Sequence, residues 1–398
     1  MKRGRSVCTT LLLASCPVVL AALMVRYPEV AVSASLQGLE IWWHNVFPAL
    51  FPFFVLSELM ISFGVVQFAA TLFEPVMRPL FRLPGAGGFV LVMGMISGFP
   101  AGARMTARLY KEQQLTKLEA ERLSAFTNFS NPLFLFSVTA VQFFHEATLG
   151  IIFALSHYIG NVAVGFVLRG TGRTLTCKEE RDDRKRRPLL LLAFKAMHRE
   201  RLDHTEPFGK LLGDAVIASV SALLAVGGFI ALFSMIYRIL IEAGTLNAAR
   251  SILCGAFAWL GFSPKLGSAL LPGIFELTIG VHQVGAVHAP MIERVVLASA
   301  LLGFCGFSIQ AQAVSILAQA GLKVRLFLIG RLMQAAFSGC AAFVLYRLFM
   351  HAGTLQISPT LASLEPLSGE AFTGLPYGSW ITASALMLFI LLLLRRKN

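Results

Sequence analysis

Charged residues are scarce in this chain of 398 residues: Asp, Glu, Lys and Arg together make up 14% of it, whereas 56% of the residues are hydrophobic. The mean hydropathy is +0.71. This balance excludes a soluble globular domain, and several apolar runs reach the roughly 18 residues that a helix needs to cross a bilayer. The composition therefore predicts an all-α polytopic membrane protein whose first partner is the lipid bilayer.

The sequence also lacks the motifs of common enzyme and metal sites. It contains no C-x-x-C pair, no H-E-x-x-H, no G-x-S-x-G and no Walker A motif. Most cysteines lie in or beside apolar segments, where a thiol behaves as a small hydrophobe. We expect no metal site, no disulfide framework, no cofactor and no enzymatic activity. The six cysteines are Cys8, Cys16, Cys177, Cys254, Cys305 and Cys340.

The net charge of +13 does not indicate a nucleic-acid partner, because no basic and aromatic binding module is present. Lys and Arg instead gather in short segments between apolar runs, which is the positive-inside pattern of membrane proteins. The most basic segment, residues 170–207, is predicted to be the main cytoplasmic loop. Both chain termini are predicted to be cytoplasmic.

The apolar runs predict about eight transmembrane helices. We interpret the first, which follows Lys2, Arg3 and Arg5, as a retained span rather than a cleaved signal peptide, because it is long for the apolar core of a signal. The predicted spans are residues 7–25, 41–63, 124–144, 150–168, 211–241, 295–317, 326–349 and 379–394.

Two further apolar stretches break the rules for a simple span. In residues 94–108, three glycines loosen the backbone, Pro100 removes an amide donor, and Arg104 and Arg108 follow one helical turn apart. Irregular backbone at membrane depth is tolerated only inside protein or along a water-filled cavity. We therefore expect a re-entrant helical hairpin over residues 88–110, and a second hairpin broken at Leu271, Pro272 and Gly273.

The two halves of the chain resemble each other at an offset close to 178 residues. Residues 94–97 (GMIS) align with 273–276 (GIFE), and Phe129-Ser130 aligns with Phe307-Ser308. Each predicted repeat has three crossings, so the second would be inverted, which is the architecture of secondary transporters. The predicted organisation is an N-terminal span (1–37), a first repeat (38–169), the basic loop (170–207), an inverted second repeat (208–349), and an outside loop with a last span (350–398).

Several of these segments resemble the YlbJ-type sporulation integral membrane proteins, which carry the nucleoside-recognition (Gate) domain also found in concentrative nucleoside transporters. The resemblance rests on SGFPAGAR (97–104), AFTNFSNPLF (125–134), HYIGN (157–161) and PGIFELTIG (272–280). It implies a bacterial membrane protein of spore formation, in the outer forespore membrane, connected with moving dipicolinic acid toward the forespore.

The first predicted hairpin supplies candidate binding residues at its tip, namely Ser97, Gly98 and Gly102. Small residues there also suit plain helix packing, but the neighbouring Pro100 frees amide groups that need a partner. A half-helix that begins near Pro100 would direct its N–H groups at an anion. Arg104 could hold a carboxylate there, or it could be an interfacial anchor.

The remaining candidates lie in other apolar segments. Asn128, Ser130 and Asn131 precede Pro132, so their side chains either face the hairpin tip or join helices by hydrogen bonds. Glu276 is an intramembrane acid, for which we expect proton or cation coupling; a structural pair with Arg104 or Arg331 is the alternative. Residues of lower rank are Thr278, Gln283, Gln310, Gln312, Arg331 and Gln334, of which Thr278 and Gln310 join the predicted site.

These features together predict a transporter of a small organic anion, with a partly cationic site between two hairpins and a proton or cation as coupling partner. Dipicolinic acid is the substrate that the resemblance implies, and a nucleoside-like solute is the second choice. A non-transporting scaffold or assembly factor of the spore envelope is the alternative from a different class. The sequence leaves homo-oligomerisation open.

Overall fold

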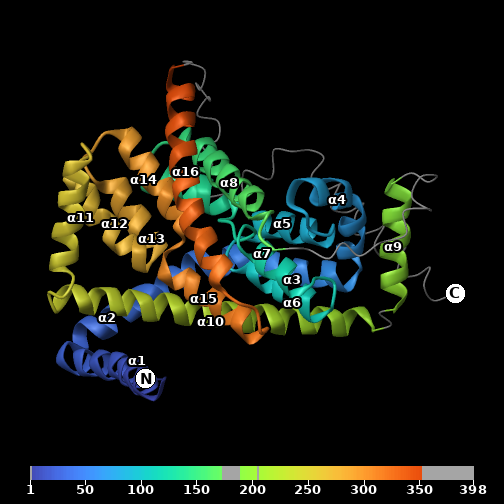
Figure 1. Cartoon of the computed structure of the whole chain (residues 1–398), viewed down its shortest axis with the longest axis horizontal. Coiled ribbons are helices and arrows are strands. Elements are labelled where there is room, and N and C mark those ends of the chain that lie inside the picture. The colour runs from blue at the N-terminus through green and yellow to red at the C-terminus, as the bar shows by residue number, and fades with distance from the viewer. Residues whose placement is uncertain (1, 173–188, 204–205, 352–398) are drawn as a thin grey trace, which may run out of the picture. The chain divides into compact units, whose positions relative to one another are not determined.

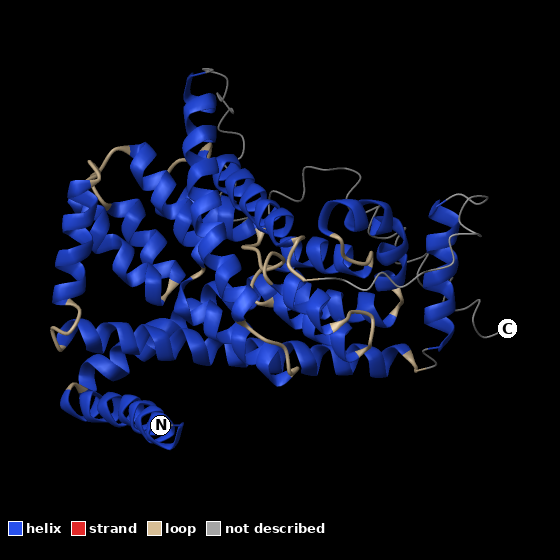
Figure 2. Ribbon diagram, viewed as in Figure 1, coloured by secondary structure: helices blue, strands red, loops and turns tan. Residues whose placement is uncertain are grey.

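The computed structural model describes residues 2–172, 189–203 and 206–351, and this part of the chain is helical without strands (Figure 2). The first half contains α1 (Lys2–Arg26), α2 (Pro28–Ile41), the π-helical turn η1 (Trp42–Val46), α3 (Phe47–Ser62), α4 (Val65–Phe81), α5 (Ala86–Ser97), α6 (Ala101–Lys111), α7 (Lys117–Ser124), the π-helical segment η2 (Phe134–Phe143) and α8 (Leu149–Leu168).

The second half follows with a similar order of elements (Figure 1). It contains α9 (Leu189–Asp203), α10 (Phe208–Glu242), α11 (Asn247–Trp259), α12 (Pro264–Phe275), α13 (Leu277–Ala286), α14 (Met291–Phe304), α15 (Gly306–Gln319) and α16 (Arg325–His351).

The prediction of an all-helical membrane protein is confirmed. In the described residues, four helical stretches are long and apolar enough to cross a bilayer: Leu149–Leu168, Phe208–Glu242, Met291–Gln319 and Arg325–Phe349. Two bent pairs would raise that number to six, Ala14–Arg26 with Pro28–His44 at 104° and Leu50–Ser62 with Val65–Phe81 at 84°. The predicted span 379–394 lies outside the described residues.

The predicted third span, residues 124–144, is not a continuous helix, as Asn131 and Pro132 indicated. Helix α7 ends at Ser124, residues 127–131 are non-helical, and η2 begins only at Phe134. Asn131 precedes a proline, which disfavours the helical conformation, and the Asn131 side chain accepts a hydrogen bond from the Phe134 amide at 2.7 Å. We call residues 125–131 the connecting segment.

The two halves place their helix breaks in the same order. The first half is interrupted between α5 and α6 and then between α7 and η2; the second is interrupted between α12 and α13 and then between α14 and α15. Contacts cross between the halves in matching pairs, since α6 packs on α15 and α13 on η2, while α7 meets α16 and α14 meets α8. The repeated order agrees with the internal sequence repeat, and its inverted orientation stays a prediction.

Glycines allow the connecting segment to pack directly against the first broken helix. A Cβ atom built on Gly94 would lie 2.3 Å from the Thr127 carbonyl oxygen, and one built on Gly102 would lie 2.0 Å from the same atom. Gly98, between the two arms, has φ +79°, which an L side chain rarely adopts. These glycines bring two buried pieces of backbone into contact.

Replacing Gly102 by Ala is therefore expected to destabilise the protein by about 1–3 kcal/mol, because the added methyl group collides with backbone that has no room to move. Gly228→Ala is the matched control: Gly228 is in the interior of α10, and an added Cβ meets nothing within 4 Å. Thermal unfolding of the purified protein in detergent would measure both. Equal melting temperatures for the two variants would contradict the close approach.

Candidate functional site

The second helix break is formed by Glu276, which is the residue between α12 and α13 and is 2% exposed. Its backbone is extended (φ −138°, ψ 121°), and its carboxylate accepts a hydrogen bond from the Ile279 amide at 2.8 Å. The carboxylate therefore caps the N-terminus of α13. The sequence placed this break at residues 271–273, which is wrong: Pro272 lies inside α12, and the helix continues to Phe275.

The first break lies where the sequence predicted it. Helix α5 ends at Ser97, Gly98 has a positive φ, the Phe99–Pro100 peptide bond is cis, and α6 begins at Ala101. Between α14 and α15 the chain turns at Cys305, with φ 73°. This last break was not expected from the sequence, which predicted an unbroken span over residues 295–317.

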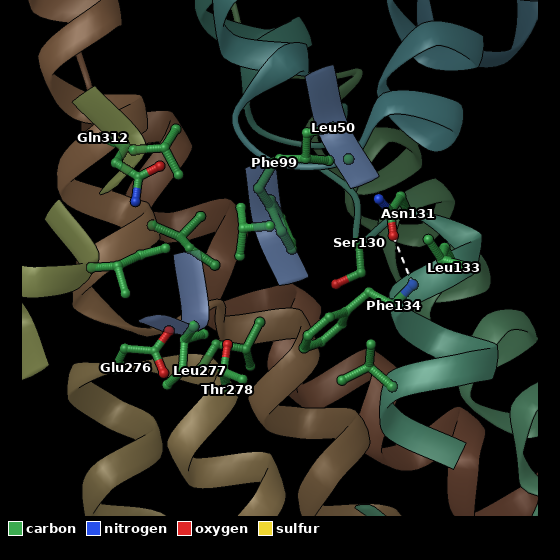
Figure 3. A pocket seen from close by; sticks show the side chains of 17 residues that line it. Leu50, Phe99, Ser130, Asn131, Leu133, Phe134, Glu276, Leu277, Thr278 and Gln312 are labelled. Atoms are coloured by element: carbon green, nitrogen blue, oxygen red, sulfur yellow. Dashed lines mark hydrogen bonds between the residues drawn. The ribbon is translucent and has the colours of Figure 1, made fainter. Parts of the chain in front are cut away.

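A cavity of about 120 Å³ lies among these breaks (Figure 3). Glu276 and Thr278 line it from the start of α13, Ser130 and Asn131 from the connecting segment, and Gln312 from α15. Most of the remaining lining is apolar. It consists of Ile41, Val46, Leu50, Gly98, Phe99, Leu133, Phe134, Val138, Val226, Ile230, Leu277 and Ile309.

Two polar atoms of this lining have no hydrogen-bond partner among the described residues, namely Ser130 Oγ and Gln312 Nε2. Ser130 is 2% exposed and Gln312 is 3% exposed. An unpaired buried polar atom costs about 1–3 kcal/mol, so such atoms are rare unless a water or ligand completes them. One hydroxyl and one amide nitrogen of the lining thus lack a hydrogen-bond partner within the described residues.

Glu276 is the only ionisable side chain among the residues that line the cavity. The first turn of α13 contributes to the same lining, whereas α15 contributes Ile309 and Gln312. Helix N-termini carry partial positive charge, which favours a negative group. The site therefore combines positive backbone dipoles with one carboxylate, and it contains no Lys or Arg.

Arg104, predicted either to bind the solute at the first break or to be an interfacial anchor, is not among the residues that line the cavity. Its guanidinium lies 2.6 Å from the Glu58 carboxylate, packs over the Phe54 ring, and does not line the cavity. Arg108 pairs with the other oxygen of Glu58 and with Glu112. Glu58 joins α3 to α6 in this way. Neither Arg104 nor Arg331 pairs with Glu276.

The other candidates divide by position. Gly98, Ser130, Asn131, Glu276 and Thr278 line the cavity, and their binding roles stay predictions. The remaining four candidates do not line it, and three have structural partners. Gly102 packs against the Thr127 carbonyl, and the Asn128 side chain accepts a hydrogen bond from the Ala103 amide at 3.1 Å. Gln310 donates a hydrogen bond to the Phe304 carbonyl at 2.9 Å. Ser97 is fully buried.

Sequence reasoning missed Phe99 and Phe134 and placed Gln312 among the residues of lower rank. Phe99 is adjacent to Gly98 and Pro100, and Phe134 begins η2 two residues after Pro132. Both phenylalanines are close in sequence to a predicted helix break, and this closeness could have identified them as lining residues. Gln312 offers no such signal, because only the turn at Cys305 brings α15 to the cavity.

Arg331 of α16 holds the connecting segment in place. This residue is 0% exposed and donates hydrogen bonds to the Ala125 carbonyl at 2.6 Å, the Asn128 carbonyl at 3.0 Å and the Asn161 side-chain oxygen at 3.2 Å. Ala125 is the C-cap of α7, where a cation is favoured by the helix dipole. Backbone carbonyls thus compensate the buried guanidinium.

His157 of α8 holds the end of the same segment. Its Nε2 accepts a hydrogen bond from the Ser130 amide at 2.9 Å, so in the neutral ring Nδ1 carries the proton. Nδ1 faces the Gln334 amide at 3.4 Å, and the Gln334 oxygen has no other partner in the described chain. When the Gln334 side-chain amide is rotated by 180°, its oxygen takes the place of the nitrogen and accepts a hydrogen bond from the His157 Nδ1–H. His157 therefore positions Ser130 at the wall of the cavity.

Arg331→Lys is expected to destabilise the protein by about 1–3 kcal/mol, because lysine keeps the charge but cannot bond several carbonyls as a planar fork does. It should also raise the reactivity of a cysteine placed at Ser130 toward a thiol reagent, since the connecting segment loses its anchor. Arg325→Lys, at the exposed start of α16, is the control. A stable Arg331→Lys protein with an unreactive Cys at position 130 would refute the positioning role.

Comparisons with known proteins agree with these features. Residues 43–147 match the family model Gate, described as nucleoside recognition. The chain is 45% identical over 342 residues to the sporulation integral membrane protein YlbJ of Bacillus subtilis, covering 85% of this chain and 83% of that protein. It is 36% identical over 89 residues to an uncharacterised protein of Alkalihalophilus pseudofirmus, covering 22% of this chain and 19% of that one.

Among solved structures, a CNTnw double variant in an outward-facing state is similar, with a TM-score of 0.41, 15% identity, and coverage of 88% of each chain. The sequence relationship to the Bacillus subtilis protein extends through both halves of the chain and past the Gate region. The chain belongs to the family of the sporulation integral membrane protein YlbJ.

Proposed function

We propose that this membrane protein is a secondary transporter that carries a small planar organic anion through the cavity, and that dipicolinic acid is the solute. The observation that carries the proposal is the pair of unpartnered atoms, Ser130 Oγ and Gln312 Nε2, in a cavity that also contains Glu276. The sporulation name of the relative supports a role in spore formation. The membrane would then be that of the forespore, with both termini in the cytoplasm.

The lining suits a flat heteroaromatic ring with polar substituents. Phe99 and Phe134 offer apolar faces for a ring, while the Ser130 hydroxyl and the Gln312 amide offer one hydrogen-bonding group each. The helix starts beside the cavity favour a carboxylate. Binding sites for small molecules are commonly built in this way, from an apolar wall and a few convergent polar groups.

Glu276 gives the proposal its coupling step. A solute carboxylate and an ionised Glu276 would repel each other inside a cavity that contains no Lys or Arg. Binding of the anion is therefore favoured when Glu276 has taken up a proton or has a bound cation. Release on the other side of the membrane would return the proton or cation with the solute. Broken helices at such a site are common in secondary transporters.

A nucleoside-like neutral solute is the second candidate. The specific observation in its favour is that the lining contains no cationic side chain that would pair with an anionic substrate. The Gate match points the same way through its description as nucleoside recognition. A neutral solute would bind without any change in the charge of Glu276.

Flux of labelled dipicolinate and of a labelled nucleoside into proteoliposomes is the first test. Dipicolinate uptake should require the protein, should be driven by an imposed gradient of protons or cations, and should fall at least about tenfold in Glu276→Gln. The exposed loop residue Glu146 supplies the control Glu146→Gln, which should transport normally. Uptake of the nucleoside alone would favour the second candidate. Absence of both fluxes in folded, oriented protein would favour a non-transporting scaffold in the spore envelope.

Gln312→Leu tests the unpartnered amide separately. It removes a buried unpaired group, so the protein should be at least as stable as the wild type, while the KM for dipicolinate should rise about tenfold because a hydrogen bond to a charged group is lost. Thermal unfolding and initial uptake rates would be measured on the same preparation. A lower stability with an unchanged KM would assign Gln312 to packing instead.

Arg104→Ala tests whether Arg104, which forms an ion pair with Glu58, contacts the transported solute. Because Arg104 lies outside the cavity lining, its loss should reduce dipicolinate and nucleoside uptake by the same factor. Glu58 keeps its ion pair with Arg108 in this variant, so the common loss should be modest. A selective loss of dipicolinate uptake would return Arg104 to the binding site.

A further inference from the structure

The C-terminal end of α10 marks the edge of the hydrocarbon layer. No charged residue occurs between Asp214 and Arg238, an interval of about 36 Å at 1.5 Å per residue, which matches a hydrocarbon core of about 30 Å. Arg238 and Glu242 are both exposed at this end of the helix. The last turns of α10 therefore lie at the level of the lipid headgroups.

A second cavity, of about 230 Å³, opens at this level. It is bounded by four helices: α10 contributes Tyr237 and Ile241, the start of α11 contributes Leu246, Asn247 and Arg250, α12 contributes Ser268 and Leu271, and α13 contributes Gln283. Five of these eight side chains are polar, in contrast to the largely apolar cavity beside Glu276. Tyr237 is 4% exposed and lines the cavity together with Gln283.

Positive charge is not balanced in this cavity. Arg250 is the only ionisable cation in the lining, no carboxylate lines it, and Arg250 forms no ion pair within the described residues. The first turn of α11, which contains Asn247, adds the partial positive charge of a helix start. A compact anion with several acceptor oxygens matches this set of donors.

Helix α11 exposes large apolar side chains next to the same cavity. Ile252 is 70% exposed, Trp259 is 85% exposed, and α11 has no buried residue. Tryptophan is typical of the membrane interface, and an amphipathic helix there rests its apolar side chains in the acyl region. Figure 1 shows α11 at the end of α10, where such a helix would meet the bilayer surface.

We propose that this cavity, formed by Tyr237, Asn247, Arg250, Ser268 and Gln283, binds the phosphate group of an anionic phospholipid headgroup. Arg250 pairs with the phosphate, the Asn247 and Ser268 side chains hydrogen-bond its oxygens or the glycerol, and the acyl chains leave along the apolar side chains of α11. The proposal is independent of the transported solute.

The site lies on the broken helix that contains Glu276. Ser268 and Leu271 belong to α12, Gln283 belongs to α13, and the Tyr237 ring lies 5.7 Å from the ring of Phe275, the residue before Glu276. A headgroup in the cavity contacts both arms of this broken helix at once. Bound lipid is thus expected to stabilise the arrangement of α12 and α13 seen here.

The test uses full-length protein purified in a neutral detergent. Short-chain phosphatidylglycerol, short-chain phosphatidylcholine and inorganic phosphate are titrated while thermal unfolding is recorded. Phosphatidylglycerol should raise the melting temperature in a saturable manner, and Arg250→Gln should weaken its apparent affinity about tenfold. Arg238→Gln removes an exposed arginine from the same end of α10 without altering the cavity lining, and it should behave like the wild type.

The outcomes separate the possible sources of the phosphate. If inorganic phosphate stabilises the protein as much as phosphatidylglycerol does, and Arg250→Gln removes this effect, the cavity binds phosphate but the proposal that a lipid is its ligand is refuted. Equal stabilisation of both arginine variants by phosphatidylglycerol would overturn the site, because the effect would then be general surface attraction. Ser268→Phe, which fills the cavity from α12, should abolish the lipid effect in a protein that still unfolds cooperatively; an unchanged lipid response would also refute the proposal.

Discussion

The structure depends on how the backbone of residues 125–131 is hydrogen-bonded at membrane depth. Water is not available there, so every irregular N–H and C=O group needs a partner within the protein. Arg331 donates hydrogen bonds to two carbonyls of this segment, and His157 accepts a hydrogen bond from the Ser130 amide. These two side chains come from α16 and α8. They therefore tie the long helices of both halves to the cavity wall.

Close backbone packing completes that constraint. The connecting segment lies against the arms of the first broken helix at Gly94 and Gly102, where no side chain fits. Asn128 links the same pieces, because its side chain accepts from the Ala103 amide and donates to the Ser124 carbonyl. The cavity wall is consequently rigid on this side. Ser130 is presented with its hydroxyl free and its backbone fixed, which suits a binding group that must keep its orientation.

The ionisable groups described here have different partners in the two halves of the chain. Arg104 and Arg108 share Glu58 and join α3 to α6, so their charges are neutralised away from the cavity. Within the described residues Glu276 has no cationic partner, and its carboxylate accepts a hydrogen bond from the first turn of α13. A carboxylate that caps a helix start can gain or lose a cation without unfolding its surroundings. In the proposed mechanism, Glu276 is therefore the residue whose binding of a proton or cation favours binding of the anionic solute.

Apolar length and charge distribution determined the class of protein, and the four long candidate spans lie where the sequence predicted them, because a bilayer imposes length and hydropathy directly on each segment. Gly98 and Pro100 likewise determined the first break by local backbone preference. Only the tertiary structure decided which side chains line the cavity. Arg104 and Glu58 are 46 positions apart, and Arg331 and Ala125 are 206 apart, so no local pattern encodes these pairings. The breaks at Glu276 and Cys305 likewise depend on the helices packed around them.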